Sequence, residues 1–264
     1  MLIREYKLRV NPAQQRAIDE AIRTTQFIRN MCVRSWMDTR GVGENDLQIY
    51  CAQLAKAFAF AARLNSQARQ TSADRAWLSI ARFYKNCREK KPGKKGYPRF
   101  QHDNRSVEYK TTGWKLEPDG KQLTFTDGNG IGTMRLIGKK GKIETFPLKQ
   151  IKRVRLMKRA DGYYVQFAVK TERSLPHEPT GKQVGIDVGL KSFYTDSDGK
   201  TVENPRYLRK AEKHLKRLHR RVSKKHKRSK NRRRAIQRLA KGYLKASLQR
   251  KDFAVKAESR VGEI

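Results

Sequence analysis

The sequence predicts an α+β fold in which a short strand and a helical region precede a run of antiparallel strands, forming a barrel or sandwich, and a basic helical pair follows. Three observations predict this fold. Apolar residues recur with helical spacing within residues 12–100, and from residue 101 the spacing changes to the two-residue period of strands. A pair of strongly basic helices is then expected at 205–253. With 264 residues, the chain is long enough for one large or two small domains.

The first residues predict a strand that leads directly into a helix. Residues 2–10 alternate polar and apolar side chains, which is typical of a strand and not of a signal peptide. Asn11 and Pro12 favour a helix start, because Asn11 is a good N-cap, Pro12 suits the first turn and Gln14 can complete a capping box. Helical spacing of apolar residues continues as far as Trp36.

Two further helices are expected, one after a loop at 41–46 and one from about Ser72. The third helix separates its faces well. Its apolar stripe, expected in the core, consists of Trp77, Ile80, Tyr84 and Cys87. Its basic face supplies the candidate nucleic-acid contacts Arg75, Arg82 and Lys85. A solvated charged face explains one such helix equally well.

Six strand-like stretches, separated by turn sequences such as "DGNG" and "RADG", favour an antiparallel barrel or sandwich. They are expected at 106–110, 121–126, 131–137, 143–148, 151–158 and 163–170. Several are basic, which fits an oligonucleotide-binding barrel. A proline-containing linker is expected at 174–182.

The charge of the chain indicates a polyanionic partner. The sequence has 62 Lys and Arg against 25 Asp and Glu, for a net charge of +37. Nucleic acid is the leading candidate partner. A membrane surface is a weaker one, since no apolar run approaches spanning length. The three cysteines are scattered, which argues against a disulfide framework or a zinc site and fits core thiols in a cytoplasmic protein.

One carboxylate is expected inside an apolar strand. Asp187 lies between Gly185 and Gly189 in the stretch "VGIDVGL". A buried, unpaired carboxylate is costly, so such an Asp usually has a partner or binds a metal. An Asp tied into its own turn is the alternative. Asp196 and Asp198 are more simply explained by a polar hairpin turn than as metal ligands.

The C-terminal stretch 209–251 predicts a helical hairpin with an apolar seam and a cationic face. It holds 20 Lys and Arg and one acid, Glu212. The first helix presents Leu208, Ala211, Leu215, Leu218 and Val222 on one stripe, and the second presents Ile236, Leu239, Tyr243 and Ala246. So many positive charges with almost no acids among them require counter-charge, which phosphates supply. A disordered basic tail is the alternative. The candidate nucleic-acid contacts are Lys210, Lys213, Lys216, Arg217, Arg220, Arg221, Lys224 and Lys225.

The ordered set of motifs resembles the TnpB family, transposon-encoded RNA-guided nucleases related to the type V CRISPR effectors. The motifs are "YKLRVNPAQQRAID", "SADRAWLSIARFYKNC", "KKGYPRFQ", "DGYYVQFAV", "VGIDVGLKSF" and the basic helical pair. The resemblance covers nearly the whole chain in the right order. It implies a wedge-type β-barrel, an inserted helical recognition lobe, and the start of a RuvC-like domain of ribonuclease-H fold.

The resemblance also implies domain bounds and partners. The expected bounds are 1–11 for the first wedge strand, 12–100 for the recognition lobe, 101–180 for the wedge barrel and 181–264 for the N-terminal part of the RuvC-like domain. The implied partners are a guide RNA and double-stranded target DNA, with base pairing reading the sequence. The implied location is a prokaryotic cytoplasm, in association with the nucleoid.

In the family, three acids hold two Mg²⁺ ions for DNA cleavage, and Asp187 matches the first of them. The family's second and third acids and its zinc ribbon have no counterpart, because Glu258 and Glu263 stand in the wrong context. We therefore expect a chain truncated within the RuvC-like domain that does not hold Mg²⁺ and does not cleave. A nuclease-inactive regulator of transposition or transcription is the alternative function, and a ribosomal-type RNA-binding protein is less compatible with these motifs.

Overall fold

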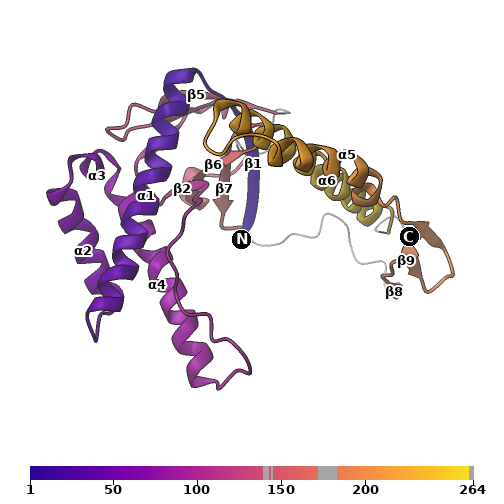
Figure 1. The fold of residues 1–264 in the computed structure, drawn as a ribbon, viewed down its shortest axis with the longest axis horizontal. Helices are drawn as coiled ribbons and strands as arrows, with labels where there is room; N and C mark the ends of the chain where they lie inside the picture. Colours follow the sequence, from indigo (N-terminus) through magenta and orange to yellow (C-terminus); the bar gives the residue numbers. More distant parts are fainter. Residues whose placement is uncertain (139–142, 144, 172–182, 262–264) are drawn as a thin grey trace. The chain divides into compact units, whose positions relative to one another are not determined.

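The computed structural model describes residues 1–138, 143, 145–171 and 183–261. The chain divides into two compact units, Met1–Arg173 (unit 1) and Ser174–Ile264 (unit 2). In the described residues, unit 1 holds a seven-stranded sheet with four α-helices, and unit 2 holds a three-stranded sheet with two long helices (Figure 1). The linker expected at 174–182 lies outside the described residues.

The strands of unit 1 form one antiparallel sheet in the order β2-β6-β7-β1-β5-β4-β3. Their bounds are β1 Leu2–Arg9, β2 Ser106–Tyr109, β3 Trp114–Leu116, β4 Gln122–Phe125, β5 Gly132–Ile137, β6 Ile151–Arg159 and β7 Gly162–Val169. β1 lies at the centre of the sheet, where it pairs with β7 on one side and β5 on the other. The N-terminal strand thus joins strands that come after all four helices in the chain. β3 has no counterpart among the strands expected from the sequence.

The sheet is strongly curled, but its ends are not hydrogen-bonded into the predicted barrel. Tyr109 lies on β2 at one edge of the sheet and Phe125 lies on β4 near the other edge. Their ring centroids are nevertheless 4.8 Å apart. The Tyr109 hydroxyl also donates to Asp127 Oδ2 at 2.7 Å. The predicted antiparallel pairing is confirmed, and no pairing joins β2 to β3 among the described strands, so the sheet is curled but open there.

The strand expected at 143–148 is wrong in the described part of this stretch. Ile143 lies in a bend, and the Phe146 amide donates to the Ile143 carbonyl at 3.2 Å, which closes a turn. Pro147 has no backbone N–H to donate to a ladder. A 3-10 helix, Leu148–Gln150, follows it and leads into β6.

Four helices lie between β1 and β2 in the chain: α1 Pro12–Asp38, α2 Glu44–Ala57, α3 Ala59–Arg63 and α4 Ser66–Arg88. The predicted start of α1 is confirmed. The Asn11 side chain accepts from the Gln14 amide at 2.8 Å, and the Gln14 side chain accepts from the Asn11 amide at 3.0 Å. α4 begins before the predicted Ser72, because Asn65 Oδ1 accepts from the Gln67 amide at 2.9 Å and caps the helix earlier.

The predicted apolar stripe of α4 is only partly in the core. Ile80 is fully buried, whereas Tyr84 is 48% exposed and Cys87 is exposed. The last two turns of α4, from Arg82, contain no buried residue. The expectation of core thiols is therefore correct for Cys32 and Cys51 and wrong for Cys87.

The sheet of unit 2 is small and antiparallel, with the order β10-β9-β8. Its strands are β8 Ile186–Asp187, β9 Ser192–Asp196 and β10 Thr201–Glu203. Asp196 Oδ1 accepts from the Asp198 amide at 3.1 Å and from the Lys200 amide at 2.7 Å. The hairpin-turn interpretation of Asp196 is thereby confirmed.

The basic stretch forms the predicted helical hairpin, with α5 Tyr207–Ser223 and α6 Lys230–Val261. Its seam contains the buried side chains of Leu215, Leu218 and Ala246. A Cβ at Gly242 would lie 3.0 Å from Leu215 Cδ2, so this glycine allows the two helices to approach closely. The connection is fixed by Arg232, whose Nη1 donates to the Val222 carbonyl at 3.0 Å.

Three residues expected in the seam are substantially exposed instead: Leu208, Ile236 and Tyr243. They lie at the margins of a stripe that is narrower than the sequence pattern suggests. Neither these two helices nor any other in the described ranges combines the length and apolar composition required to cross a bilayer.

Candidate nucleic-acid interface

The exposed face of the hairpin carries a dense row of cations. All eight cations predicted in and after α5 are exposed: Lys210, Lys213, Lys216, Arg217, Arg220, Arg221, Lys224 and Lys225. Of these, Lys216 alone forms an ion pair with a described residue, at 2.7 Å from Glu212 Oε1. Lys216 lowers the pKa of the Glu212 carboxyl through this hydrogen bond. The structure thus brings the predicted cations together on one helix and leaves most of them available to a ligand.

α6 adds cations that the sequence pattern did not single out. Its exposed Arg and Lys residues include Arg233, Arg234, Arg238, Lys241 and Lys245. A hollow of about 420 Å³ lies between the two helices and is lined by Leu218, Arg221, Lys225, Asn231, Arg234, Ala235 and Arg238. Four of these seven residues are cationic and none is acidic. The number of cations in the second helix was visible in the sequence. Which of them face solvent depends on how the two helices pack.

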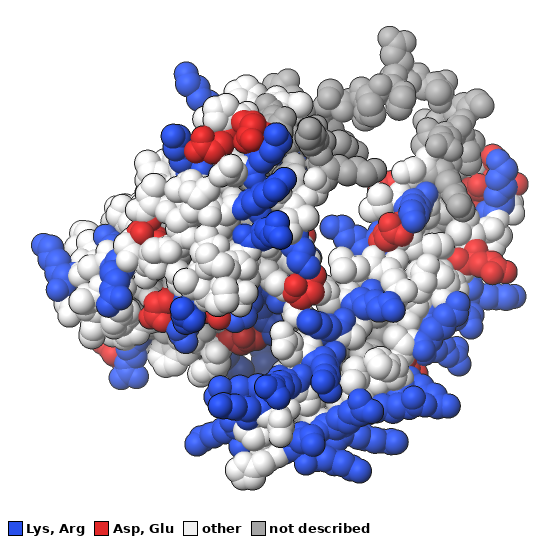
Figure 2. Space-filling model, turned by 90° about the horizontal axis from the view of Figure 1, so that it is seen from above, with Lys and Arg blue, Asp and Glu red and all other residues white. Residues whose placement is uncertain are grey.

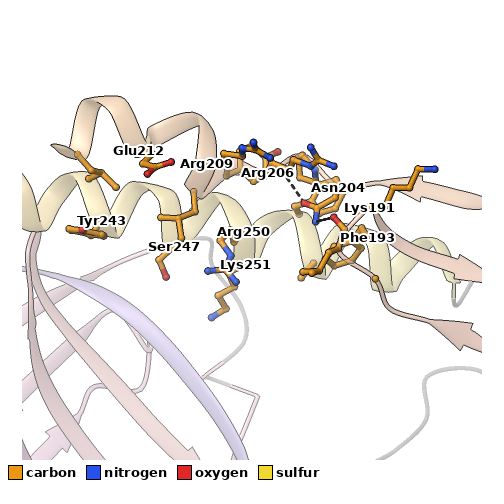
Figure 3. Close-up of a pocket in the computed structure, with 18 of the residues that line it drawn as sticks. Lys191, Phe193, Asn204, Arg206, Arg209, Glu212, Tyr243, Ser247, Arg250 and Lys251 are labelled. Carbon is orange, nitrogen blue, oxygen red and sulfur yellow. Dashed lines mark hydrogen bonds between the residues drawn. The ribbon is translucent and has the colours of Figure 1, made fainter. Parts of the chain in front are cut away.

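A larger groove of about 1420 Å³ lies within unit 2 beside the start of α5 (Figure 3). Its lining comes from the loop around Leu190, Phe193 of β9, residues 204–206, α5 as far as His219, and the part of α6 from Tyr243 to Ala254. Basic side chains around it include Lys191, Arg206, Arg209, Arg250 and Lys251. In the space-filling view of Figure 2, Lys and Arg side chains crowd parts of the surface with few carboxylates between them.

Aromatic rings form part of the groove lining. Phe253 of α6 contacts Phe193 of β9 with ring centroids 4.9 Å apart, and it contacts Tyr207 of α5 at 6.1 Å. The Asn204 side chain ties two walls together, because it donates to the Leu190 carbonyl at 3.3 Å and accepts from the Arg206 amide at 3.0 Å.

Arg206, at the N-cap of α5, has a left-handed backbone conformation with φ 49°. Such a conformation is uncommon for a non-glycine residue and costs about 1 kcal/mol or more. The hydrogen bond that the Arg206 amide donates to Asn204 Oδ1 holds it in place. As a result, the Arg206 side chain lies among the residues that line the groove.

Asp187 lies on β8, opposite Thr195 of β9, and is exposed. The expectation of a carboxylate inside a buried strand is therefore wrong, since the neighbouring Ile186 is 47% exposed and Val188 is 73% exposed. A two-metal site requires several carboxylates around the ions. No group of three His, Cys, Asp or Glu residues within the described ranges could hold a metal. The residues described around Asp187 thus do not fit a magnesium pair by themselves.

The three cations predicted on α4 have different surroundings. Arg75 is mostly enclosed, and its Nη2 lies 3.2 Å from Glu108 Oε2. Desolvation lowers the pKa of Arg75, although Glu108 acts in the opposite direction. Arg82 and Lys85 are exposed, and Lys85 lies 3.7 Å from Glu89. Arg75 therefore serves the packing of unit 1, whereas the other two remain available at the surface.

Sequence reasoning missed the carboxylate that organises these arginines. Glu108 of β2 is 2% exposed and also contacts Arg153 and Arg155 of β6, at 2.8 and 2.6 Å. Burial alone would raise the pKa of Glu108, but the charge of Arg75 and hydrogen bonds from the β6 arginines lower it overall. No spacing rule links these positions, because they meet only after α4 and the sheet have packed.

Comparisons with known proteins match this arrangement to one family. Residues 166–264 match the family model OrfB_IS605, described as "Probable transposase". Over 164 residues the chain is 28% identical to "Putative RNA-guided DNA endonuclease InsQ" of Escherichia coli (strain K12), covering 61% of this chain and 38% of that protein. A second relative, "Putative RNA-guided DNA endonuclease" of Streptomyces pristinaespiralis, is 35% identical over 103 residues.

These matches support a TnpB-family protein. The second match covers 39% of this chain and 25% of the Streptomyces protein, so the chain matches well under half the length of either relative. A solved structure, "Cryo-EM structure of CRISPR-Cas12f Ternary Complex", is similar over 92% of this chain and 59% of that chain. That similarity has 12% sequence identity and a TM-score of 0.34.

Proposed function

We propose that this TnpB-family chain binds nucleic acid through the cationic face of the α5–α6 hairpin, as part of RNA-guided recognition of DNA. The observation that carries this proposal is the set of eight exposed cations on and after α5, of which only Lys216 is paired with a described acid. Phosphates would replace the missing counter-charge and release their condensed ions, which drives binding.

The shape of the hairpin favours a phosphate backbone as the ligand. The hollow lined by Arg221, Lys225, Arg234 and Arg238 brings cations from both helices to one place. Because Gly242 keeps the helices close and Arg232 fixes their connection, these cations are held on a packed scaffold. Phosphate contacts of this kind position a strand without reading its bases. In this proposal, base pairing with a guide RNA supplies the sequence specificity.

The two units have proposed roles within this function. Unit 1 is assigned to the wedge, with α1–α4 as the recognition lobe, because β1 pairs with β7 and β5 while the helices intervene in sequence. Unit 2 is assigned to the N-terminal part of a RuvC-like domain, with Asp187 as its first acid. The proposed partners are a guide RNA and double-stranded target DNA.

Binding without cleavage is the activity that the described residues support best. Mg²⁺ would polarise the scissile phosphate and activate water in a complete RuvC-like site. Asp187 is the residue here that would contact it, but the described residues supply no set of three ligands. This observation favours the alternative of a nucleic-acid-binding regulator for the chain acting alone.

The test is binding of the purified full chain to RNA transcribed from the DNA flanking its gene, beside an unrelated RNA of the same length. Target DNA and Mg²⁺ are added to the same reactions, which are scored for cleavage. We expect the flanking RNA to be bound more tightly, without cutting, and the Asp187→Ala variant to bind equally well. Equal binding of both RNAs would contradict guided recognition, and magnesium-dependent cutting that Asp187→Ala abolishes would contradict the binding-only role.

A further inference from the structure

Unit 1 has a cluster of four aromatic rings, two of them exposed, that the proposed function does not use. The aromatic cluster consists of Trp36 of α1, Phe83 and Tyr84 of α4, and Tyr97 of the segment after α4. Trp36 has its ring centroid 5.4 Å from that of Tyr97 and 5.9 Å from that of Tyr84. Phe83 lies 5.3 Å from Tyr97. The rings therefore form one connected surface feature built from three segments.

The segment that carries Tyr97 is fixed although it has no regular secondary structure. The Asn86 side chain of α4 donates to the Lys95 carbonyl at 3.0 Å. From α1, Arg29 Nη1 donates to the Arg99 carbonyl at 3.0 Å. Asn30 of α1 then exchanges two hydrogen bonds with the Gln101 backbone, at 2.8 and 2.9 Å. Side chains of two helices thus hold the segment on both sides of Tyr97.

The rings are held in position, and two of them, those of Tyr84 and Tyr97, are open to solvent, whereas Trp36 and Phe83 are partly buried. Tyr97 is 54% exposed and Tyr84 is 48% exposed. Trp36 Nε1 donates to the Tyr84 hydroxyl at 2.7 Å, which fixes the orientation of both rings. Single exposed aromatics need no explanation, but a rigid exposed group is typical of a binding surface.

The stretch of chain that carries three of the four rings is strongly cationic. Residues 82–99 contain one acid, Glu89, and eight cations: Arg82, Lys85, Arg88, Lys90, Lys91, Lys94, Lys95 and Arg99. Glu89 lies between Lys85 at 3.7 Å and Lys91 at 3.4 Å, so its charge is already balanced. The ligand that complements this surface combines negative charge with flat apolar groups.

We propose that the aromatic cluster and the cations of residues 82–99 form a second nucleic-acid site, which binds unpaired nucleotides by stacking their bases on Tyr97 and Tyr84. The proposal deepens the proposed function and rests on it for the ligand class. Bases of a single strand have free faces that stack on aromatic side chains, whereas those of a duplex are already stacked on each other. The cations would hold the phosphates on either side of the stacked bases.

The test compares four fluorescent ligands with the full chain: a 12-nucleotide RNA, the same sequence as DNA, a duplex of that length, and an abasic strand with the same phosphates. We expect Tyr97→Ala and Tyr84→Ala to weaken binding of both base-carrying single strands about tenfold. Binding of the duplex and of the abasic strand is expected to change less than twofold. A loss for RNA and not for DNA would still support stacking and would assign the site to RNA.

Substitutions at one position separate stacking from packing. Tyr97→Phe keeps a ring and is expected to bind single strands as the wild type does, whereas Tyr97→Leu keeps apolar volume and is expected to bind as Tyr97→Ala does. Leu78→Ala is the matched control, because Leu78 is a 62% exposed apolar side chain on α4 outside the aromatic cluster. Thermal unfolding of every variant shows whether the fold is retained.

Two results would overturn the inference. One is unchanged single-strand binding in Tyr97→Ala; the other is an equal loss for the abasic strand, which would mean that the ring only supports the backbone around it. A variant with reversed charges on the hairpin distinguishes failure of this inference from failure of the proposed function. That variant is expected to lose affinity for all four ligands and to keep its preference for bases over the abasic strand.

Discussion

At the scale of single residues, Glu108 connects α4 to the sheet of unit 1. Its carboxylate is 2% exposed and lies within 3.2 Å of Arg75 on α4 and within 2.8 Å of Arg153 and Arg155 on β6. Because Arg75 is largely enclosed as well, removing the charge of Glu108 would leave a cation without its counter-ion. Breaking such a pair is costly, since the remaining charge cannot be hydrated fully.

The lowered pKa of Glu108 gives its contribution to stability a defined pH dependence. The folded carboxyl holds its charge to lower pH than the unfolded one. The contribution is therefore present above the ordinary Glu pKa of about 4.3 and is lost as the pH falls through the lowered folded value. We expect Glu108→Gln to reduce the free energy of unfolding by about 2–3 kcal/mol at pH 7, and the difference to shrink on acidification.

Urea unfolding of both proteins between about pH 3 and pH 7 measures this effect. Glu117→Gln is the matched control, because the Glu117 side chain is 38% exposed and its nearest cation, Lys115 Nζ, lies 4.0 Å away. We expect that control to change stability by less than about 1 kcal/mol. A pH-independent difference at Glu108 would show that its charge does not stabilise the fold.

Residue roles that depend on local sequence were predictable, and those that depend on packing were not. The capping box of Asn11 and Gln14 and the turn of Asp196 involve neighbours within four positions. The exposure of Asp187 and the enclosure of Arg75 are set by elements distant in sequence. A helical-face pattern predicts which side Arg75 is on, but not that β2 covers that side.

At the scale of elements, the closeness of α5 and α6 depends on Gly242. Its missing side chain lies against Leu215 and Leu218, where a Cβ would be 3.0 and 3.3 Å from their methyl carbons. These methyls belong to flexible side chains, so one added carbon is accommodated by small shifts. A larger side chain has no such space between the helices.

We expect Gly242→Leu to destabilise the hairpin by about 1–3 kcal/mol through overpacking, despite the better helix propensity of leucine. Amide hydrogen exchange of α5 and α6 would report the change locally. Gln249→Leu, at an exposed position of the same helix, is the control and is expected to leave exchange unchanged. Equal protection in both variants would mean that the helices do not require the glycine.

The sequence predicted the existence of most elements better than their limits. The hairpin, α1 and the antiparallel strands were all expected from periodicity and turn chemistry. The strand at 143–148 was wrong because the turn at Phe146 interrupts it, and the seam was drawn too wide because Leu208 and Ile236 lie at its margin. The exposure of residues at the edge of the seam depends on the angle at which the two helices cross, and the periodicity of the sequence does not specify that angle.

At the scale of the molecule, the central place of β1 is a non-local feature. Its pairing with β5 and β7 joins the first nine residues to strands beyond residue 130, across the whole helical insertion. Composition and turn signals indicate strands but not their order, and here the resemblance to a family supplied what the residues alone did not. The net charge of +37 is the other whole-molecule property, and it was readable directly from the sequence.

The positive charge of the chain is concentrated rather than spread evenly, and its largest share lies on the hairpin that we propose as the binding surface. If about eight cations of the hairpin contact the phosphates of a single strand, log affinity falls against log salt with a slope near −6. Lys213, Arg217 and Arg220 lie within that surface and are exposed. Reversing their charge together would remove three contacts and introduce repulsion.

The measurement that tests this most directly is the salt dependence of single-stranded RNA binding, comparing the wild type with the triple variant Lys213→Glu, Arg217→Glu and Arg220→Glu. A control triple variant, Arg16→Glu, Lys56→Glu and Lys115→Glu, has the same net charge and changes exposed cations of unit 1. We expect the hairpin variant to flatten the slope by about 2 or more, and the control variant to keep it near the wild-type value. Equal slopes for the two triple variants would contradict this expectation, because net charge rather than the hairpin would then determine binding.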